Sequence, residues 1–286
     1  MLRCIGRDNP GLFYVDFSRI TIWESAPQTS VRAEFLFSDR QIAETEARLR
    51  QAVAAIASRF PLSQMDKYER ELALHDCLAR EISYDYGGVN SDNITVVGGL
   101  LHKKAVCEGY AKTFKLLCDR AGLSCVVVGG TATPKGEPGE GHAWNIVKLN
   151  GVCAHVDVTW DSTSRADDET CYDHFNITDD DIAQDHAWDR ALLPPCASAE
   201  NNWHVKNGYL AQSDAEFKSF IAAQLAAGQK SFSVKLGTRY PDQNAVAKVI
   251  DSALAGNFLG SFFFGGVLSY AMRYNPVRNI VSVVFR

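Results

Sequence analysis

The chain has 286 residues, of which 46% are hydrophobic and 22% are charged, and its formal net charge is −5. These values are typical of a globular protein that is long enough for one large domain or two small ones. The acidic balance, without a basic stripe among aromatic residues, argues against a nucleic-acid-binding protein. No apolar run reaches the length of a membrane span, and the run at 262–266 is far too short.

Residues 1–14 lack the charged segment followed by an apolar segment that is typical of a signal peptide. This predicts a cytoplasmic protein, or an exported one if the natural chain is longer. The chain contains eight cysteines, an even number. Its length supplies a core without disulfides, and a reactive thiolate has to stay reduced, so Cys77, Cys118 and Cys125 are predicted to be buried thiols.

Region 1–62 is predicted to form strands and one helix. Apolar residues alternate between 31 and 37, as they do in a half-buried strand. A helix is predicted over 39–60, because Ser38 followed by Gln41 has the spacing of a capping box.

The next region, 63–195, is predicted to contain two helices, one with an apolar face that includes Leu74 and Leu78 and one that begins at Cys107. Apolar residues follow Cys107 at helical spacing, and the pattern stops at Gly122, which suits the left-handed position past a helix end. The unpaired amides and the positive dipole end at a helix start favour the thiolate, which attacks carbonyl groups. Most free cysteines are only small buried hydrophobic residues, so this position needs support from others.

Two strands, 142–149 and 152–159, are predicted on either side of Asn150-Gly151, a strong signal of a type I′ hairpin. His142 and Asp157 then become diagonal neighbours within side-chain reach. This register pairs three positions directly: Leu149 with Val152, Trp144 with Asp157, and His142 with Thr159.

The two faces of this hairpin differ. One face is predicted to enter the core and carries Ala143, Asn145, Val147, Leu149, Val152, Ala154, Val156 and Val158. The other face carries His142, Trp144, His155 and Asp157, and it is expected to form a cleft against the Cys107 helix. A slip of one residue would bury the charged set, so the register is well determined.

Cys107, His142 and Asp157 fit the chemistry of a thiol nucleophile. A neutral imidazole takes the thiol proton and returns it to the leaving group, while a carboxylate on the far ring nitrogen holds the tautomer. His155 is a rival base, but it lies in the middle of a strand, whereas His142 opens its strand after a glycine-rich segment. We therefore prefer His142 and interpret His155 as a supporting or packed histidine.

With these motifs in order, the sequence resembles the transglutaminase-like superfamily, the papain-related cysteine enzymes that include transglutaminases, bacterial transglutaminase-like cysteine proteases and peptide N-glycanases. The resemblance covers roughly 120 residues, and three motifs in order are more specific than any one alone. The matching segments are Leu74-His75-Asp76, Tyr84-Asp85-Tyr86, the Cys107 helix, the His142 and Asp157 strands, and 172–177.

The resemblance implies an α+β fold with a papain-like core, in which an antiparallel sheet packs on the nucleophile helix between N- and C-terminal α/β segments. It also implies that Cys107, His142 and Asp157 are the nucleophile, the base and the orienting acid. Papain-like enzymes use a glutamine as the second oxyanion donor, but no glutamine lies between Gln64 and Cys107. The two amide side chains in that interval, Asn90 and Asn93, are expected to serve turns, so the second donor stays open.

Two segments are expected to modulate the site. The segment 129–141 contains five glycines and two prolines, and both a mobile lid and a solvated loop fit it. The segment 161–189 contains ten acidic residues and one arginine, Arg165. It is predicted to be a solvated face, or a rim of the cleft that attracts cationic or amine-bearing substrates such as lysine-rich peptides.

The third region, 196–286, follows Pro194-Pro195 and a polar stretch. Its predicted elements are a strand, a helix and two closing strands, at 231–236, 241–254, 267–274 and 279–285. The three regions are predicted as an N-terminal segment, a catalytic core and a C-terminal subdomain, in an α+β protein with an antiparallel sheet.

The sequence therefore predicts a cysteine-dependent acyl-transfer enzyme that acts on protein or peptide amides without a cofactor. Hydrolysis is favoured over transfer to an amine, because the glycine-rich segment offers few apolar groups to exclude water. The alternatives are a protein-glutamine transglutaminase, a glycan-releasing amidase and a non-catalytic peptide-binding module. The residues expected to line the substrate cleft are Trp144, Trp160, Tyr110 and His155.

A metal site is the remaining alternative for the polar cluster. Zinc ligands usually occur as closely spaced pairs of cysteine or histidine residues, and the four residues that a zinc ion would have to use here include no Cys-x-x-Cys or His-x-x-x-His pair. No metal is therefore predicted. The set that a zinc ion would have to use is Cys107, Cys153, His142 and His155.

Overall fold

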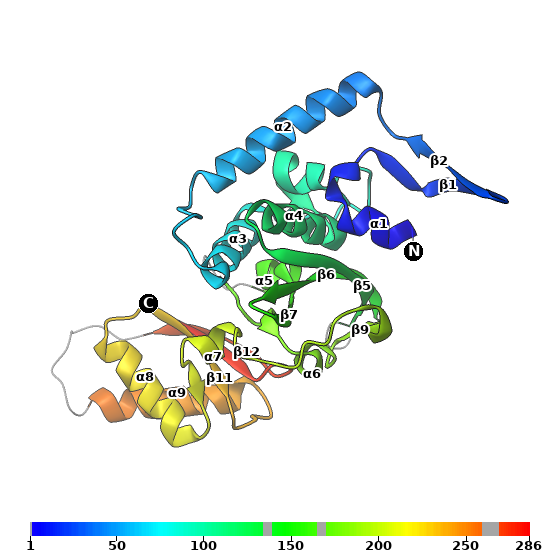
Figure 1. The fold of residues 1–286 in the computed structure, drawn as a ribbon. Helices are drawn as coiled ribbons and strands as arrows, with labels where there is room; N and C mark the ends of the chain where they lie inside the picture. The colour runs from blue at the N-terminus through cyan, green and yellow to red at the C-terminus, as the bar shows by residue number, and fades with distance from the viewer. Residues whose placement is uncertain (1, 134–138, 165–169, 259–268) are drawn as a thin grey trace.

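The computed structural model describes residues 2–133, 139–164, 170–258 and 269–286. Helices and strands alternate along the chain, and the predicted α+β class is confirmed. Figure 1 shows a central sheet with helices above it, an N-terminal hairpin that projects to one side, and a C-terminal unit below. None of the described helices combines the length and the apolar composition of a membrane span.

The N-terminal region forms a short helix, a hairpin and a long helix. The elements are α1 (Leu2–Asp8), the 3₁₀ turn η1 (Pro10–Leu12), β1 (Val15–Ser25), β2 (Gln28–Phe35) and α2 (Asp39–Ala57). The capping box of Ser38 and Gln41 is confirmed, and α2 ends slightly earlier than predicted. The apolar residues of β2 do not enter a core, because the hairpin projects from the molecule and Val31 and Phe35 stay exposed (Figure 1).

The central region contains the two predicted helices, α3 (Lys67–Glu81) and α4 (Cys107–Arg120). Leu74 and Leu78 of α3 are buried, as predicted. α4 begins at Cys107, and Gly122 follows its end with φ +73°, so both predicted limits are confirmed. Between the helices lie β3 (Ser83–Tyr84), the π-helical turn η2 (Gly98–His102) and β4 (Lys104–Ala105).

A five-stranded antiparallel sheet forms the centre, in the order β8-β7-β6-β5-β9. Its strands are β5 (Ser124–Ala132), β6 (Glu140–Leu149), β7 (Val152–Val156), β8 (Phe175–Ile177) and β9 (His186–Trp188). α4 packs on one face, where Ala111 of the helix contacts Ala143, and Asn145 Nδ2 donates to the Ala111 carbonyl oxygen. The predicted packing of the nucleophile helix on an antiparallel sheet is therefore confirmed.

The hairpin register is confirmed at the turn and fails at the strand ends. Leu149 pairs with Val152, and Asn150 and Gly151 both have positive φ, as a type I′ turn requires. β7, however, ends at Val156, and the short helix α5 (Val158–Thr163) follows. The predicted pairs of Trp144 with Asp157 and of His142 with Thr159 are therefore wrong. The cause is the Asp157 carboxylate, which caps α5 by accepting the Trp160 amide and so ends the strand.

The second face of the sheet is also covered. α4 lies on the apolar face, opposite to the face on which a cleft was predicted. Trp144 and the neighbouring side chains pack instead against the segment after β8, in a cluster made of Val128, Trp144, Ile146, Cys153, Ile177, Ile182 and Cys196. The predicted cleft on this face is therefore filled, because both faces of the sheet are buried.

Both ends of the glycine-rich segment belong to strands. Residues 129–132 continue β5 and pair with residues 140–143 of β6. A Cβ atom at Gly130 would lie 2.1 Å from the Ala187 carbonyl oxygen, so this glycine lets β9 approach closely. The part of the segment that could act as a lid, 134–138, lies outside the described residues.

The C-terminal region has its own sheet and core. The sheet order is β10-β11-β13-β12, and α8 and α9 lie against it (Figure 1). The predicted strand, helix and closing strands occur as β11 (Ser231–Leu236), α9 (Gln243–Phe258), β12 (Tyr270–Asn275) and β13 (Ile280–Phe285). Two short helices precede this region, α6 (Asp179–Ile182) and η3 (Arg190–Leu192). The other elements within the region are α7 (Trp203–Lys206), β10 (Leu210–Ala211) and α8 (Asp214–Ala226). The separate apolar cluster around Phe217 and Val281 supports a boundary near 195, and we keep 1–62, 63–195 and 196–286 as proposed units.

Candidate active site

Cys107 occupies the first position of α4. The preceding residue, Val106, is the N-cap and provides no side-chain hydrogen bond to the helix amides. All eight cysteines are free thiols; Cys4 is exposed, Cys107 is half-buried, and the other six are buried, including the three that were predicted to be buried. The amides of the first turn of α4, which begins at Cys107, therefore have no side-chain cap from the N-cap residue.

His142 and Asp157 meet at the end of the sheet. His142 Nε2 lies 2.7 Å from Asp157 Oδ2, and Asp157 has no exposed surface. Burial alone would raise the pKa of Asp157, but the charges and hydrogen bonds of His142 and His186 together outweigh burial and hold the pKa well below its usual value. Burial lowers the pKa of His142, yet Asp157 and then Cys107 outweigh it and raise the pKa to about 10. At neutral pH the His142 ring therefore carries a proton on both nitrogens.

Cys107 lies beside the same imidazole. A side-chain hydrogen bond to Cys107 is one of the causes that raise the pKa of His142. Because Nε2 faces Asp157, Nδ1 is the ring nitrogen that is left for the thiol. The three residues that the sequence singled out are thus brought together, in the order thiol, imidazole and carboxylate.

A second histidine shares Asp157, and the sequence reasoning missed it. His186 Nε2 lies 3.2 Å from the same oxygen, Asp157 Oδ2. His186 comes from β9, a three-residue edge strand that pairs with β5. The strand is too short to produce a periodic signal, and the acidic residues around it favoured the interpretation as a solvated face.

A cavity of about 190 Å³ opens beside His142. Of the four residues predicted to line the cleft, Trp160 lines this cavity, whereas Trp144, Tyr110 and His155 are buried and do not line it. Their polar atoms bind inside the protein: Tyr110 donates to the Ile82 carbonyl oxygen, and Trp144 Nε1 donates to His155 Nδ1 over 2.9 Å. The Trp144 ring stacks on the ring of His142, with centroids 6.0 Å apart. The lining that the sequence did not predict consists of Tyr84, Tyr86, Ala132, Glu140, Gly141, Thr159 and Thr163.

His155 is a packed histidine rather than a base. Its Nε2 lies 2.8 Å from Asp179 Oδ1, and its Nδ1 accepts the Trp144 indole N–H. Burial lowers its pKa to about 4, so the ring is neutral at physiological pH. With Nδ1 as an acceptor, the proton of the neutral ring is on Nε2.

Two groups of side chains in the described residues have the proximity of metal ligands. They are His142 with Asp157 and His186, and His155 with Asp179 and Cys196. Neither group is the predicted alternative set of Cys107, Cys153, His142 and His155. The second group is unsuited to a metal, because the Trp144 contact keeps the proton on the His155 nitrogen that would have to bind it. In the first group, the short contacts are accounted for by hydrogen bonds to Asp157.

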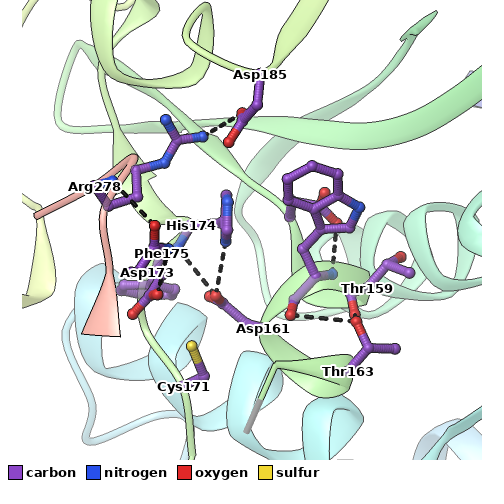
Figure 2. Close-up of polar contacts among 12 residues, drawn as sticks. Thr159, Asp161, Thr163, Cys171, Asp173, His174, Phe175, Asp185 and Arg278 are labelled. Atoms are coloured by element: carbon purple, nitrogen blue, oxygen red, sulfur yellow. Dashed lines mark hydrogen bonds and ion pairs between the residues drawn. The ribbon is translucent and has the colours of Figure 1, made fainter. Parts of the chain in front are cut away.

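The acidic segment is not wholly solvated, and its residues 165–169 lie outside the described residues. Among its described residues, Asp173 binds Arg273 over 2.6 Å, Asp181 binds Lys235 over 3.2 Å, and Asp185 binds Arg278. Asp161 is buried between His75 and His174; Figure 2 shows its contact with His174 and the pair of Asp185 and Arg278. Asp173, Asp181 and Asp185 attach the C-terminal region to the core, so these three carboxylates are not free to attract a cationic substrate.

Residues 54–160 match the family model of the transglutaminase-like superfamily. The predicted resemblance is therefore confirmed. The matched segment contains Cys107, His142 and Asp157, and it ends before His186.

Two curated relatives bear the name kyphoscoliosis peptidase. The Mus musculus protein is 42% identical over 67 residues, which are 21% of this chain and 10% of that protein. The Homo sapiens protein is 33% identical over 104 residues, which are 33% of this chain and 16% of that protein. The chain thus spans a small part of either relative. Among solved structures, a crystal structure of a TGase has a TM-score of 0.36 at 12% identity and covers 58% of this chain and 50% of that chain.

Proposed function

We propose that the chain is a cysteine-dependent acyl-transfer enzyme that hydrolyses protein or peptide amides. Cys107 is the nucleophile, His142 the acid and base, and Asp157 the residue that orients the imidazole. The observation that carries the proposal is the 2.7 Å contact of His142 Nε2 with the buried Asp157, which leaves Nδ1 for Cys107. The family match over 54–160 and the peptidase names of the two relatives support it.

The proposed reaction starts from a thiolate and an imidazolium. The Cys107 sulfur adds to the amide carbonyl carbon, and the electron pair of the carbonyl moves to its oxygen. When the tetrahedral intermediate collapses, the carbon–nitrogen bond breaks and the amine leaves with a proton from His142 Nδ1. Water then adds to the thioester while His142 takes its proton, and the carbon–sulfur bond breaks to release the carboxylic acid and regenerate the thiolate and the imidazolium. Asp157 remains ionised throughout and stabilises the imidazolium.

The oxyanion needs two donors. The free amides at the start of α4 support the first, since Val106 supplies no competing side-chain cap. For the second, which the sequence left open, we propose the hydroxyl of Tyr84. Tyr84 lines the cavity together with His142, and after burial the nearby Cys107 is the next cause of its raised pKa.

Water is favoured as the acceptor over an amine. Transfer to an amine requires that water is kept from the thioester. Tyr86 at the cavity is 83% exposed. Trp144, an aromatic residue that was expected to line the cleft and help exclude water, is buried and does not line the cavity. Among the described carboxylates of the acidic segment, Asp173, Asp181 and Asp185 are paired with cations of the C-terminal region. These observations support hydrolysis of the acyl-enzyme.

Thiol labelling tests the nucleophile. With limiting iodoacetamide at neutral pH, mass spectrometry should find the adduct on Cys107 before Cys4, although Cys4 is the more exposed thiol. Cys107→Ser should leave the slower label on Cys4 unchanged. If Cys107 reacts only after unfolding, the nucleophile is assigned incorrectly.

An amide substrate tests the reaction and the acceptor. A fluorescent casein digest in the presence of a labelled primary amine separates three outcomes. Release of free peptides that depends on Cys107 supports the hydrolase, and predominant incorporation of the amine indicates a transglutaminase. Binding of peptide without either product indicates a peptide-binding module.

A further inference from the structure

His186 lies between two carboxylates at the edge of the candidate site. Its Nε2 is 3.2 Å from Asp157 Oδ2, and its Nδ1 is 2.6 Å from Asp185 Oδ1. The side chain has no exposed surface. The backbone of β9, paired with β5, fixes the ring at this point.

These two contacts determine the protonation of the ring. Ionised carboxylates only accept hydrogen bonds, so both contacts are hydrogen bonds only when both ring nitrogens carry protons. His186 is then a buried cation between two anions, which satisfies the requirement that buried charges are paired. His75 has the same arrangement between Asp76 and Asp161, each 3.1 Å away. There burial lowers the pKa of His75, but the two carboxylates outweigh burial and raise the pKa to about 9.

Asp185 also contacts a cation from the C-terminal region. Arg278 donates to Asp185 and to the Asp181 carbonyl oxygen, and its side chain is fully buried. Figure 2 shows the contact between Arg278 and Asp185. Arg278 lies between β12 and β13, so this contact joins the C-terminal sheet to the segment that carries His186.

We propose that His186 is a positioning residue, which holds Asp157 from the side opposite His142 and, through Asp185, connects the candidate triad to Arg278. The inference rests on the proposed function, because His186 acts through Asp157 and His142. With the proposed thiolate, the connected groups alternate in charge along Cys107, His142, Asp157, His186, Asp185 and Arg278. These contacts connect the nucleophile to the C-terminal region. The C-terminal region therefore completes the site.

The charge of His186 acts on its neighbours. The rings of His186 and His142 have centroids 5.3 Å apart, and two positive rings at this distance repel each other. The positive charge of His186 therefore makes the protonated His142 easier to deprotonate. The groups that face His186 from the elements around it are Asp157 before α5, His142 of β6, His155 of β7, His174 before β8, Asp185, and Arg278 beyond Asp185.

His186→Gln tests the charge, because the glutamine amide can still donate to Asp157. The rate of Cys107 alkylation by iodoacetamide is measured as a function of pH. The resulting pH–rate profile is followed over its acidic limb and its alkaline limb. The alkaline limb, which follows the loss of the His142 proton, should move upward by about one pH unit or more, since a positive charge has been removed from a buried cluster. His186→Ala should lose a further ~10-fold in rate, because the hydrogen bond to Asp157 is lost too.

His75→Gln is the matched control, since it removes another buried histidine between two carboxylates, outside the site. It should lower the urea midpoint as His186→Gln does, without moving either limb. A wild-type pH profile in folded His186→Gln overturns the inference, as does an equal loss of rate in both variants without any displacement of the limbs. The proposed function fails separately, if wild-type Cys107 reacts no faster than Cys4.

Discussion

Replacing Asp157 with asparagine tests the candidate site where most of its contacts converge. Asp157 Oδ2 faces the Nε2 atoms of His142 and His186, and Oδ1 accepts the Trp160 amide. Asparagine keeps the size of the side chain and one oxygen, but its amide presents N–H groups to rings that also donate. The substitution therefore removes the charge and leaves the shape almost unchanged.

The pKa of His142 gives the magnitude. The pKa is raised from 6.5 to about 10 in spite of burial. At ~1.36 kcal/mol per pH unit, this difference corresponds to roughly 5 kcal/mol. Cys107 contributes part of it, so Asp157 is expected to supply roughly 3–4 kcal/mol.

The first assay is the rate of Cys107 alkylation and of amide hydrolysis at neutral pH. Both should fall by about 10³-fold or more, because His142 loses the partner that holds its proton and its tautomer. The variant should still fold, because asparagine keeps the size of the side chain and an oxygen that can cap α5, although the charge contribution of Asp157 to stability is lost.

The second assay is stability against pH, and its sign is fixed by the direction of each pKa change. The folded pKa of His142 is raised, so the stabilisation it provides is complete below pH 6.5 and is lost as the pH rises through about 10. The folded pKa of Asp157 is lowered, so its contribution is present above 3.8 and is lost only in acid. Urea denaturation between pH 6.5 and 10 should show a decline in the wild type that Asp157→Asn lacks. The reasoning is refuted if the variant alkylates at the wild-type rate or keeps that decline.

Three other substitutions test separate parts of the structure. His142→Ala should abolish labelling of Cys107 by weak electrophiles, whereas His155→Ala should retain much of it once folding is checked by circular dichroism; equal loss in two folded variants would reject the choice of base. Tyr84→Phe should lower kcat by ~10²-fold with little change in KM, as expected for an oxyanion donor, and an unchanged kcat would exclude that role. Asp173→Asn should cost about 3–5 kcal/mol in urea denaturation, because it leaves Arg273 without its charged partner, and a cost below 1 kcal/mol would mean that this pair does not attach the C-terminal region.

Local signals in the sequence identified the elements that carry the three site residues. The start of α4 at Cys107 follows from apolar spacing within one helix and from Gly122 at its end, which are interactions between residues close in the chain. The turn at Asn150-Gly151 fixed the pairing of β6 and β7 for the same reason. Even the end of β7 had a local cause, since Asp157 caps α5, but the apolar alternation through 158 concealed it.

The surroundings of the triad depend on contacts between distant parts of the chain. The cover over Trp144 comes from residues after β8, which no pattern within β6 reveals. The partners of the acidic segment, Arg273 and Arg278, lie about ninety to one hundred residues further along the chain, and His186 reaches Asp157 only because β9 adds to the edge of the sheet.

The sequence by itself thus determined the helix start, the hairpin turn and the joint presence of a thiol, an imidazole and a carboxylate. The tertiary structure decided which of the seven histidines contact Asp157, that both faces of the sheet are covered, and which carboxylates are already paired. The physical reason is that helix caps and tight turns depend on neighbouring residues, whereas burial and charge pairing depend on which segments meet in space.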